Sequence, residues 1–199
     1  MSLREDLAKL IKGDVVDDAE SIKTYSRDTS IFERAPKVVV FPKDADDVSA
    51  VVAYVAGAKS RGEHISIAAR SAGTDMTGGP LTDSVALVFT KYMNGVGPIT
   101  GDVATAEPGA YYRDFEKMTK SAVGKILASY PASREYCAIG GIVANNSGGE
   151  LTLRYGKTEK YVRSLDVVFS DGSQVTMKPL SPSELAMKEA ERTFEGEIY

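Results

Sequence analysis

The sequence has almost none of the residues that build disulfide frameworks and zinc sites. Its 199 residues include one cysteine, one histidine and no tryptophan. One residue of each kind excludes a disulfide, and a zinc site made of cysteine and histidine, within this chain. His64 lies between an expected helix end and an expected strand, where a surface or capping role is more common than catalysis. Cys137 stands in an apolar setting, which is typical of an unreactive thiol.

The sequence also has no excess of basic residues and no long apolar run. Lys and Arg total 24 against 28 Asp and Glu, giving a net charge of −4. This balance argues against nucleic acid as a partner, because no surplus of positive charge is available to neutralise phosphates. No apolar run is long enough to span a bilayer, and the first residues lack the apolar core of a signal peptide. We therefore expect a cytoplasmic protein and leave open a peripheral contact with the inner face of the membrane.

Three common motifs are absent as well. Gly156, Lys157 and Thr158 match the end of a P-loop, but Leu151 stands where that motif needs its first glycine. The dinucleotide fingerprint G-x-G-x-x-G and the nucleophile elbow G-x-S-x-G do not occur. We therefore reject a P-loop nucleotide triphosphatase, and neither a classical dinucleotide-binding motif nor a nucleophile elbow supports a function here.

The most informative stretch present is residues 65–80, ISIAARSAGTDMTGGP. A short apolar run gives way at Arg70 to small residues, so several backbone amides are free to converge on one point. Such a nest binds anions, and Arg70 would add positive charge. The stretch therefore suggests a phosphate or diphosphate site. An ordinary glycine-rich turn between two strands is the alternative.

The residues around this stretch predict a β–α–β unit. Residues 37–41 (KVVVF) form a continuous β-branched run, typical of a strand buried on both faces. Apolar residues at helical spacing run from Asp44 to about Arg61, and residues 65–69 supply the next strand. Ligands of α/β proteins commonly lie at the carboxyl ends of strands, where this order places the Arg70 loop.

A second informative stretch is residues 131–149, PASREYCAIGGIVANNSGG. Adjacent Gly140 and Gly141 let a backbone or a flat ligand come within contact distance. Asn145, Asn146 and Ser147 supply hydrogen-bond donors and acceptors. Close packing of a helix against a sheet also demands small residues, so ligand binding and packing both remain open here.

Periodicity and turn residues predict the remaining elements. An amphipathic helix over residues 3–11 is expected to end at Gly13, and residues 14–34 to form a loop-rich arm anchored by Tyr25 and Phe32. Three acidic residues are interpreted as the start of the long helix, not as a metal site: Asp44, Asp46 and Asp47. The elements expected beyond residue 80 are a strand over 85–89, a turn built on Gly95, Gly97 and Pro98, a strand over 103–107, a helix over 112–120 with Phe115 and Met118 facing inward, a hairpin over 165–177 and a helical tail over 184–194.

Five stretches in this order match a known family. They are KVVVFPKDADDVSAVV, the Arg70 loop, the stretch PAS…AIGGIVANNSGG, the element Arg154-Tyr155-Gly156 and the hairpin VVFSDGSQV. The chain resembles the N-terminal FAD-binding domain of the vanillyl-alcohol oxidase superfamily, the PCMH-type or FAD-linked oxidase domain, and within it the D-lactate and glycolate dehydrogenase branch. The resemblance implies an α+β fold with a small β–α–β lobe and a larger mixed-sheet lobe.

The resemblance also implies a domain division and a cofactor. Residues 1–34 would be an N-terminal helix and arm, residues 35–180 the FAD-binding domain, and residues 181–199 the start of a linker toward a substrate domain. The residues that would bind FAD are Arg70, Ser71, Ala72, Gly73, Thr74, Asp75, Pro131, Ser133, Ile139, Gly140, Gly141, Ala144, Asn145, Asn146, Ser147 and Val162. Family members with a covalent flavin have a histidine where Thr74 stands, so the resemblance implies FAD bound without a covalent link.

By the same resemblance, the intact enzyme would oxidise a small 2-hydroxy acid such as D-lactate or glycolate. It would pass a hydride to the flavin and electrons on to a quinone, another acceptor or oxygen. A C-terminal substrate domain or a separate subunit would supply the base, so we expect this chain alone to be a fragment with little turnover. Two alternatives remain: the FAD domain of a cell-wall precursor reductase or of a molybdenum hydroxylase, and a non-enzymatic module that has lost FAD.

Overall fold

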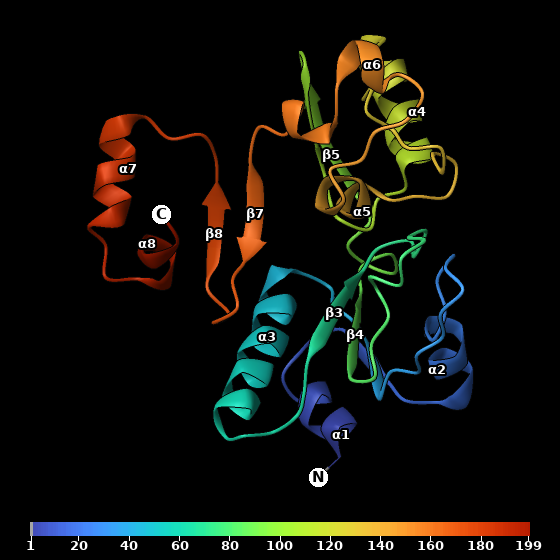
Figure 1. Cartoon of the computed structure of the whole chain (residues 1–199), viewed down its shortest axis with the longest axis vertical. Coiled ribbons are helices and arrows are strands. Elements are labelled where there is room, and N and C mark those ends of the chain that lie inside the picture. Colours follow the sequence, from blue (N-terminus) through green and yellow to red (C-terminus); the bar gives the residue numbers. More distant parts are fainter. Residues whose placement is uncertain (1) are drawn as a thin grey trace.

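The computed structural model of the chain describes residues 2–199, and its first lobe is built on a four-stranded sheet (Figure 1). The strand order is β1-β2-β4-β3, in which β2, β4 and β3 run parallel and β1 pairs antiparallel with β2. The strands are β1 (Asp14–Val16), β2 (Val38–Phe41), β3 (Ile67–Arg70) and β4 (Val85–Val88). The expected β–α–β unit is therefore present, with β4 inserted between its two strands.

Both faces of this sheet are covered. Alternate residues of β2 and β4 face α1 (Leu3–Ala8) and α3 (Ala45–Ser60), and the others face α2 (Ala19–Tyr25). All eight positions of these two central strands are buried, as expected for β-branched runs without polar alternation. This confirms the prediction of strands buried on both faces.

Asp47 has a structural role that its position at a helix start did not reveal. Asp44 caps α3 by accepting the backbone N–H of Asp47, as expected. Asp47 itself is buried, and its carboxylate accepts the backbone N–H groups of Lys12, Gly13 and Lys43. Such hydrogen bonds satisfy a buried carboxylate, so Asp47 joins the start of α3 to the segment that leads into β1.

The N-terminal predictions need two corrections. The first helix ends at Ala8, before the predicted end at Gly13. Gly13 instead lies against β2, where a Cβ atom would come 2.0 Å from the carbonyl oxygen of Phe41. Residues 14–34 contain β1 and α2, which the sequence did not predict, besides the expected loop segments.

The two expected anchors of this arm behave differently. Tyr25 packs edge-on against Phe41, with ring centroids 5.6 Å apart. Phe32 is 56% exposed, so its expected anchoring role was wrong. Its ring lies under Gly78 in a surface contact between the arm and the loop after β3.

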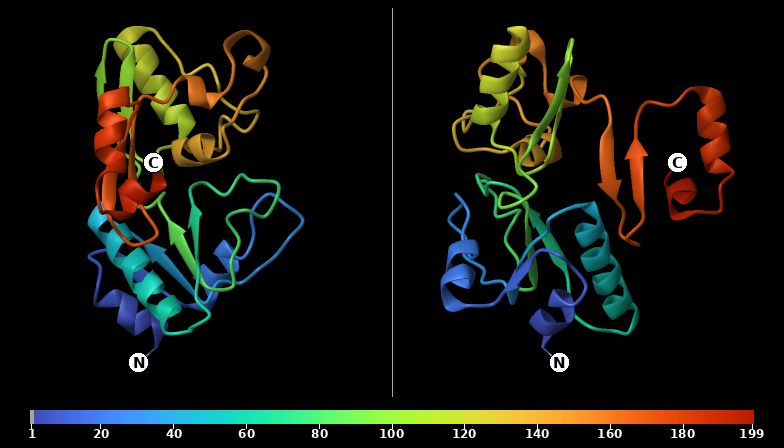
Figure 2. Two further views of the ribbon diagram at one scale, coloured as in Figure 1. Left: turned by 60° about the vertical axis from the view of Figure 1, so that its left-hand side comes forward. Right: turned by 180° about the vertical axis from the view of Figure 1, so that it is seen from behind.

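The second lobe combines an antiparallel ribbon with short helices (Figures 1 and 2). The elements are β5 (Val96–Thr100), β6 (Val103–Ala106), α4 (Tyr112–Val123), α5 (Ile139–Ala144), α6 (Thr152–Tyr155) and the 3-10 helix η1 (Thr158–Lys160). A second ribbon, β7 (Leu165–Val168) with β8 (Gln174–Met177), and the helices α7 (Pro182–Glu189) and α8 (Phe194–Ile198) follow. The α+β fold with two lobes is confirmed. The mixed sheet lies in the first lobe, whereas the later strands form two antiparallel ribbons.

Two predictions in the second lobe were wrong. Gly97 and Pro98, expected in a turn, lie inside β5, where the register shifts between Val96 and Ile99. Proline is tolerated there because β5 is an edge strand and the irregularity removes a ladder bond. Met118, expected to face inward, is 42% exposed.

The second ribbon reaches back to the first lobe. The turn between β7 and β8 rests on α3, where the hydroxyl of Ser49 donates a hydrogen bond to the carbonyl of Gly172. A Cβ atom at Gly172 would lie 2.9 Å from that of Ala53, so the turn needs glycine for this approach. The side-chain amide of Gln174 donates to Asp46 at 3.1 Å. Figure 2 shows the ribbon beside α3, next to the tail.

Among residues 2–199 no helix has the length and apolar character needed to cross a bilayer. The division of the chain at residues 34 and 180 stays a prediction.

Candidate functional site

Arg70 ends β3, and its side chain lies beneath the loop that follows. The residue is 8% exposed, and its guanidinium carbon lies 5.4 Å from the centre of the Tyr25 ring. Gly73 sits directly over it, with φ of +70°, and a Cβ atom there would come 2.3 Å from Nη2. Nη1 of Arg70 is buried without a hydrogen-bond partner. Burial lowers the pKa of this guanidinium, since the charged form loses its water.

Asp28 on the arm acts electrostatically on Arg70 and partly balances its charge. Its Oδ2 atom is also buried without a partner. A buried cation with an unused donor is costly, and a bound anion is one of the partners that would satisfy it. Arg70 therefore marks the loop as an anion-binding candidate.

The structure brings together the two glycine-rich stretches found in the sequence. The hydroxyl of Ser71 donates to the carbonyl of Pro108 at 2.9 Å, and the amide of Gly140 donates to the same oxygen at 2.9 Å. A Cβ atom at Gly140 would lie 2.7 Å from Oγ of Ser71. The Arg70 loop and the start of α5 thus meet over Pro108, between the lobes.

Gly140 and Gly141 lie in different surroundings, which bears on the alternatives left open above. At Gly140 the close contacts with Ser71 and Pro108 need the absence of a side chain, which is the packing interpretation. At Gly141 a Cβ atom would meet no atom within 4 Å. Packing does not require glycine there, so open space beside α5 is left for a ligand.

The carboxylate of Asp75 is directed into its own loop. Oδ2 accepts hydrogen bonds from Oγ1 of Thr77 at 2.6 Å and from the amide of Gly79 at 2.7 Å. The hydrogen bond from Thr77 is the main cause that lowers the pKa of Asp75. The carbonyl of Asp75 accepts from Thr29 on the arm at 2.8 Å. Asp75 therefore shapes the loop, while Ala72 and Thr74 lie half-buried in it.

Residues 131–149 form a loop whose ends meet. The backbone of Gly149 lies against that of Tyr130, which directly precedes the loop. A Cβ atom on Gly149 would come 2.4 Å from the carbonyl oxygen of Tyr130. The Tyr130 hydroxyl donates to Glu150 at 2.6 Å. Pro131 and Ser133 lie half-buried at the start of the loop, where the carbonyl of Ser133 accepts two backbone amides.

The far part of this loop runs from α5 to Ser147. Ile139 begins α5, and its amide donates to Ala110. Asn146 has a φ of +44°, which asparagine tolerates better than most residues. Its Oδ1 accepts the amide of Glu159 at 3.0 Å, and Thr158 donates to the carbonyl of Ser147 at 2.8 Å.

Thr158, in the segment that matches the end of a P-loop, thus holds Ser147, and the adjacent Glu159 holds Asn146. Ala144 and Asn145 are exposed at the end of α5, and Val162 is half-buried just after η1. The predicted residues from Arg70 to Ser71 and from Ile139 to Gly141 lie together. Pro131, Ser133 and Val162 lie farther along the second lobe's own loops.

Sequence reasoning missed a partly buried ion pair beside this loop. Glu116 on α4 is 8% exposed and accepts Nη2 of Arg134 on both carboxylate oxygens, at 2.7 and 2.6 Å. Glu116 lies one turn after Tyr112, whose side chain is also buried. That spacing places both residues on one helix face, and it could have indicated that Glu116 is buried. Glutamate is usually exposed to solvent, so the sequence alone favoured a surface position.

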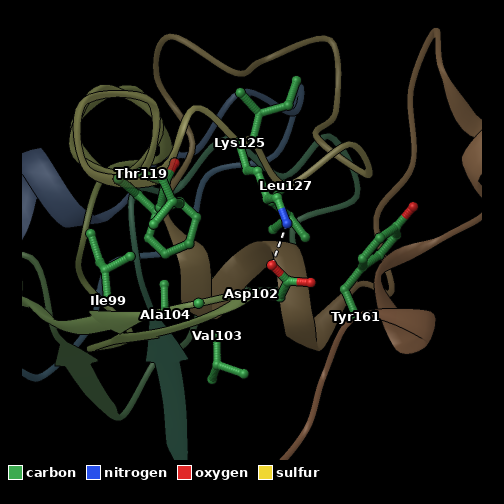
Figure 3. Close-up of a pocket in the computed structure, with 12 residues that line it drawn as sticks. Ile99, Asp102, Val103, Ala104, Thr119, Lys125, Leu127 and Tyr161 are labelled. Carbon is green, nitrogen blue, oxygen red and sulfur yellow. Dashed lines mark hydrogen bonds and ion pairs between the residues drawn. The ribbon is translucent and has the colours of Figure 1, made fainter.

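A separate cavity of about 140 Å³ lies between α4 and the β5–β6 ribbon (Figure 3). Ile99, Ala104 and Leu127 line it, and an ion pair of Asp102 with Lys125 closes one side. No residue predicted to bind a ligand lines this cavity. It is therefore distinct from the candidate site.

The single histidine and cysteine do not join the site. His64 precedes β3, at the opposite end of the strand from Arg70. Cys137 is buried, and burial raises the pKa of its thiol. Within residues 2–199 no group of His, Cys, Asp and Glu side chains is arranged to hold a metal ion.

Comparison with protein families gives a match over most of the chain. Residues 36–178 match a family described as the FAD binding domain. The chain is 29% identical over 201 residues to the glycolate oxidase subunit GlcD of Bacillus subtilis, covering 98% of this chain and 41% of that protein. It is 25% identical to D-2-hydroxyglutarate dehydrogenase of Pseudomonas putida, covering 94% of this chain and 19% of that protein. D-lactate dehydrogenase of Archaeoglobus fulgidus is 28% identical over 86% of this chain and 38% of its own length.

Solved structures share the fold at lower identity. Xylooligosaccharide oxidase from Myceliophthora thermophila superposes with a TM-score of 0.76 at 18% identity, covering 92% of this chain and 38% of that chain. For 6-hydroxy-D-nicotine oxidase from Arthrobacter nicotinovorans the TM-score is 0.73 at 22% identity, with 88% and 38% covered. The chain thus spans well under half the length of these relatives.

Proposed function

The chain belongs to the FAD binding domain family, and on that premise we propose that it is the flavin-binding part of an oxidoreductase acting on 2-hydroxy acids. The observation that carries this proposal is the unused Nη1 of buried Arg70, beneath a loop of small residues at the carboxyl end of β3. The names of three relatives, a glycolate oxidase subunit and two dehydrogenases of D-2-hydroxy acids, support the substrate class.

The residues around Arg70 fit a diphosphate. The loop from Arg70 to Asp75 would hold it through backbone amides, because small side chains leave those amides accessible. Arg70 raises the electrostatic potential of the loop from below, and Gly73 is the position that lets the guanidinium lie so close. Asp75 contributes through its hydrogen bonds to Thr77 and Gly79, which fix the loop's shape.

The second loop fits a flat ring and its linker. The open space beside Gly141 would accept the ribityl chain and flavin, with the following residues along them: Ile139, Gly140, Ala144, Asn145, Asn146 and Ser147. Pro131 and Ser133 would line the cofactor, and Val162 would contribute a backbone contact. When bound, FAD supplies the acceptor for the hydride removed from the carbon that bears the substrate hydroxyl.

We infer that FAD is held without a covalent link. One solved relative carries a 6-S-cysteinyl, 8α-N1-histidyl FAD, which needs a cysteine and a histidine at the flavin. Here Thr74 stands in the loop, His64 lies at the other end of β3, and Cys137 is buried among apolar groups. None of these positions supports such a bond.

The described residues bind and orient the cofactor and exclude water from one side of it. The substrate-binding groups and the base belong, in this proposal, to a substrate domain or a separate subunit. The partial coverage of every curated relative supports this, at 19% of one and 41% of another. A peripheral contact with a membrane would then also depend on that second part.

The visible absorption spectrum of the purified chain tests the proposal. We expect a flavin spectrum, present on purification or after adding FAD, which passes entirely to the supernatant on acid precipitation. Colour retained in the pellet would contradict noncovalent attachment. A chain that neither carries nor takes up FAD, and gains no thermal stability from it, would contradict flavin binding and favour a module that has lost its cofactor.

A further inference from the structure

A chain of side-chain contacts joins helix α4 to both ends of the 131–149 loop. Glu116 binds Arg134, which lies in the first turn of the loop. The guanidinium of Arg134 stacks on the ring of Tyr130, 4.4 Å from its centre. The hydroxyl of Tyr130 donates to Glu150, just beyond the loop's other end, at 2.6 Å.

These contacts combine burial with charge, and so they are stronger than typical surface pairs. Glu116 and Tyr130 are 8% and 5% exposed. Both oxygens of Glu116 are used by one nitrogen of Arg134, and the carboxylate also lies 3.5 Å from Lys120. Hydrogen bonds to ionised partners are roughly twice as strong as neutral ones. Removing one buried partner leaves the other charge uncompensated.

Tyr130 is the point where this chain of contacts closes the loop. Its ring packs against Tyr112 of α4, with centroids 5.5 Å apart. Its carbonyl touches Gly149, and its hydroxyl holds Glu150. The hydrogen bond to Glu150 also raises the pKa of the Tyr130 hydroxyl.

We propose that Tyr130 is a positioning residue that holds the 131–149 loop closed and so pre-organises it for the flavin. Glu116 acts through Arg134, whose guanidinium fixes the Tyr130 ring from the other side. This proposal rests on the proposed function, since the loop is the one assigned to the flavin. A loop already held in its bound shape loses less conformational freedom when the ligand arrives, and affinity rises accordingly.

We call the hydrogen bond from Tyr130 to Glu150 the closing bond, and two variants remove it, one at the donor and one at the acceptor. Tyr130→Phe keeps the ring and deletes the hydroxyl, and Glu150→Ala deletes the acceptor on an exposed residue that the fold does not need. Glu150→Gln keeps an acceptor oxygen and is the conservative rescue. Tyr92→Phe is the matched control, because Tyr92 donates in the same way to Asp14, at 2.7 Å, in the first lobe.

Two readouts separate this proposal from the proposed function. Hydrogen exchange without FAD reports loop closure through the amides of Arg134, Cys137 and Gly149, which are bonded within the loop or to Thr152. We expect exchange about tenfold faster in Tyr130→Phe and Glu150→Ala, the equivalent of ~1.4 kcal/mol in opening. Exchange near the wild-type rate is expected in Glu150→Gln and Tyr92→Phe.

The dissociation constant for FAD is the second readout. We expect it to rise about tenfold in the two closing-bond variants and to stay the same in Tyr92→Phe. Unchanged exchange in both closing-bond variants would overturn the proposal. So would faster exchange with unchanged FAD affinity. A wild-type chain that takes up no FAD would instead refute the proposed function, while the exchange data would still show whether Tyr130 closes the loop.

Discussion

Gly73 lies directly over the guanidinium of Arg70, so close that a methyl group on Gly73 would stand 2.3 Å from Nη2. The buried cation and the glycine above it therefore depend on each other. Arg70 is held in place at the end of β3, paired with Val88 of β4, whereas Gly73 lies beyond the sheet. Their relationship makes the loop testable by substitution.

Gly73→Ala should displace Arg70 and weaken FAD binding at least tenfold. The left-handed backbone at φ +70° adds a cost of about 1 kcal/mol for any side chain. Gly101→Ala is the control, because Gly101 has φ +57° and open space around it. Titration with FAD and urea unfolding of both variants measure the two effects. Equal loss of FAD affinity in both would show that only backbone strain matters.

Arg70→Met should separate binding from stability. Removing the buried charge relieves its desolvation, which offsets the loss of its stacking on Tyr25 and of its attraction to Asp28, so the denaturant midpoint should change little. The FAD dissociation constant should nevertheless rise at least tenfold, since the loop loses its positive charge. If stability and affinity fell together, Arg70 would be a structural residue only.

The two adjacent glycines should respond in opposite ways to valine. Gly140→Val meets Ser71 and Pro108 and should destabilise the chain without any ligand, by about 2 kcal/mol. At Gly141 an added Cβ atom would meet nothing within 4 Å outside its own helix, so Gly141→Val should leave the thermal midpoint of the free chain within a few degrees. It should still abolish the stabilisation by FAD. A Gly141→Val chain that binds FAD normally would place the flavin elsewhere.

The hydrogen bond from Thr77 to Asp75 should make the loop sensitive to acid. The pKa of Asp75 is lowered in the folded chain, so its stabilising contribution is fully present above the unfolded value of about 3.9. That contribution is lost as the pH falls through the lower folded value. Thr77→Val should therefore be less stable than wild type near pH 6, with the difference shrinking below pH ~4. A difference that stays constant down to pH ~2 would contradict this assignment.

The sequence predicted well those elements whose cause is local. The β-branched run of β2, the Asp44 cap and the Asp-Gly turn of the second ribbon each depend on neighbouring residues, and each was confirmed. The turn predicted at Pro98 was wrong, because β5 pairs with one neighbour only and its register shift makes room for a proline.

The parts that escaped prediction depend on residues far apart in the chain. Ser71 and Gly140 meet because the hydroxyl of Ser71 and the amide of Gly140 both donate to the carbonyl oxygen of Pro108, which lies between the lobes. Glu116 and Arg134 form a partly buried pair, although each residue alone would be expected on the surface. The sequence predicts only that Asp47 is one of several acidic residues at a helix start. In the structure its carboxylate accepts hydrogen bonds from three backbone amides.

The contact of the second ribbon with α3 limits how the two lobes can move. The chain passes from the first lobe to the second after β4, and it returns to the first lobe where Gly172 meets Ser49. These two connections, one covalent and one a packed hydrogen-bonded contact, oppose a simple separation of the lobes. The second ribbon thus connects the two lobes a second time, in addition to the chain segment after β4.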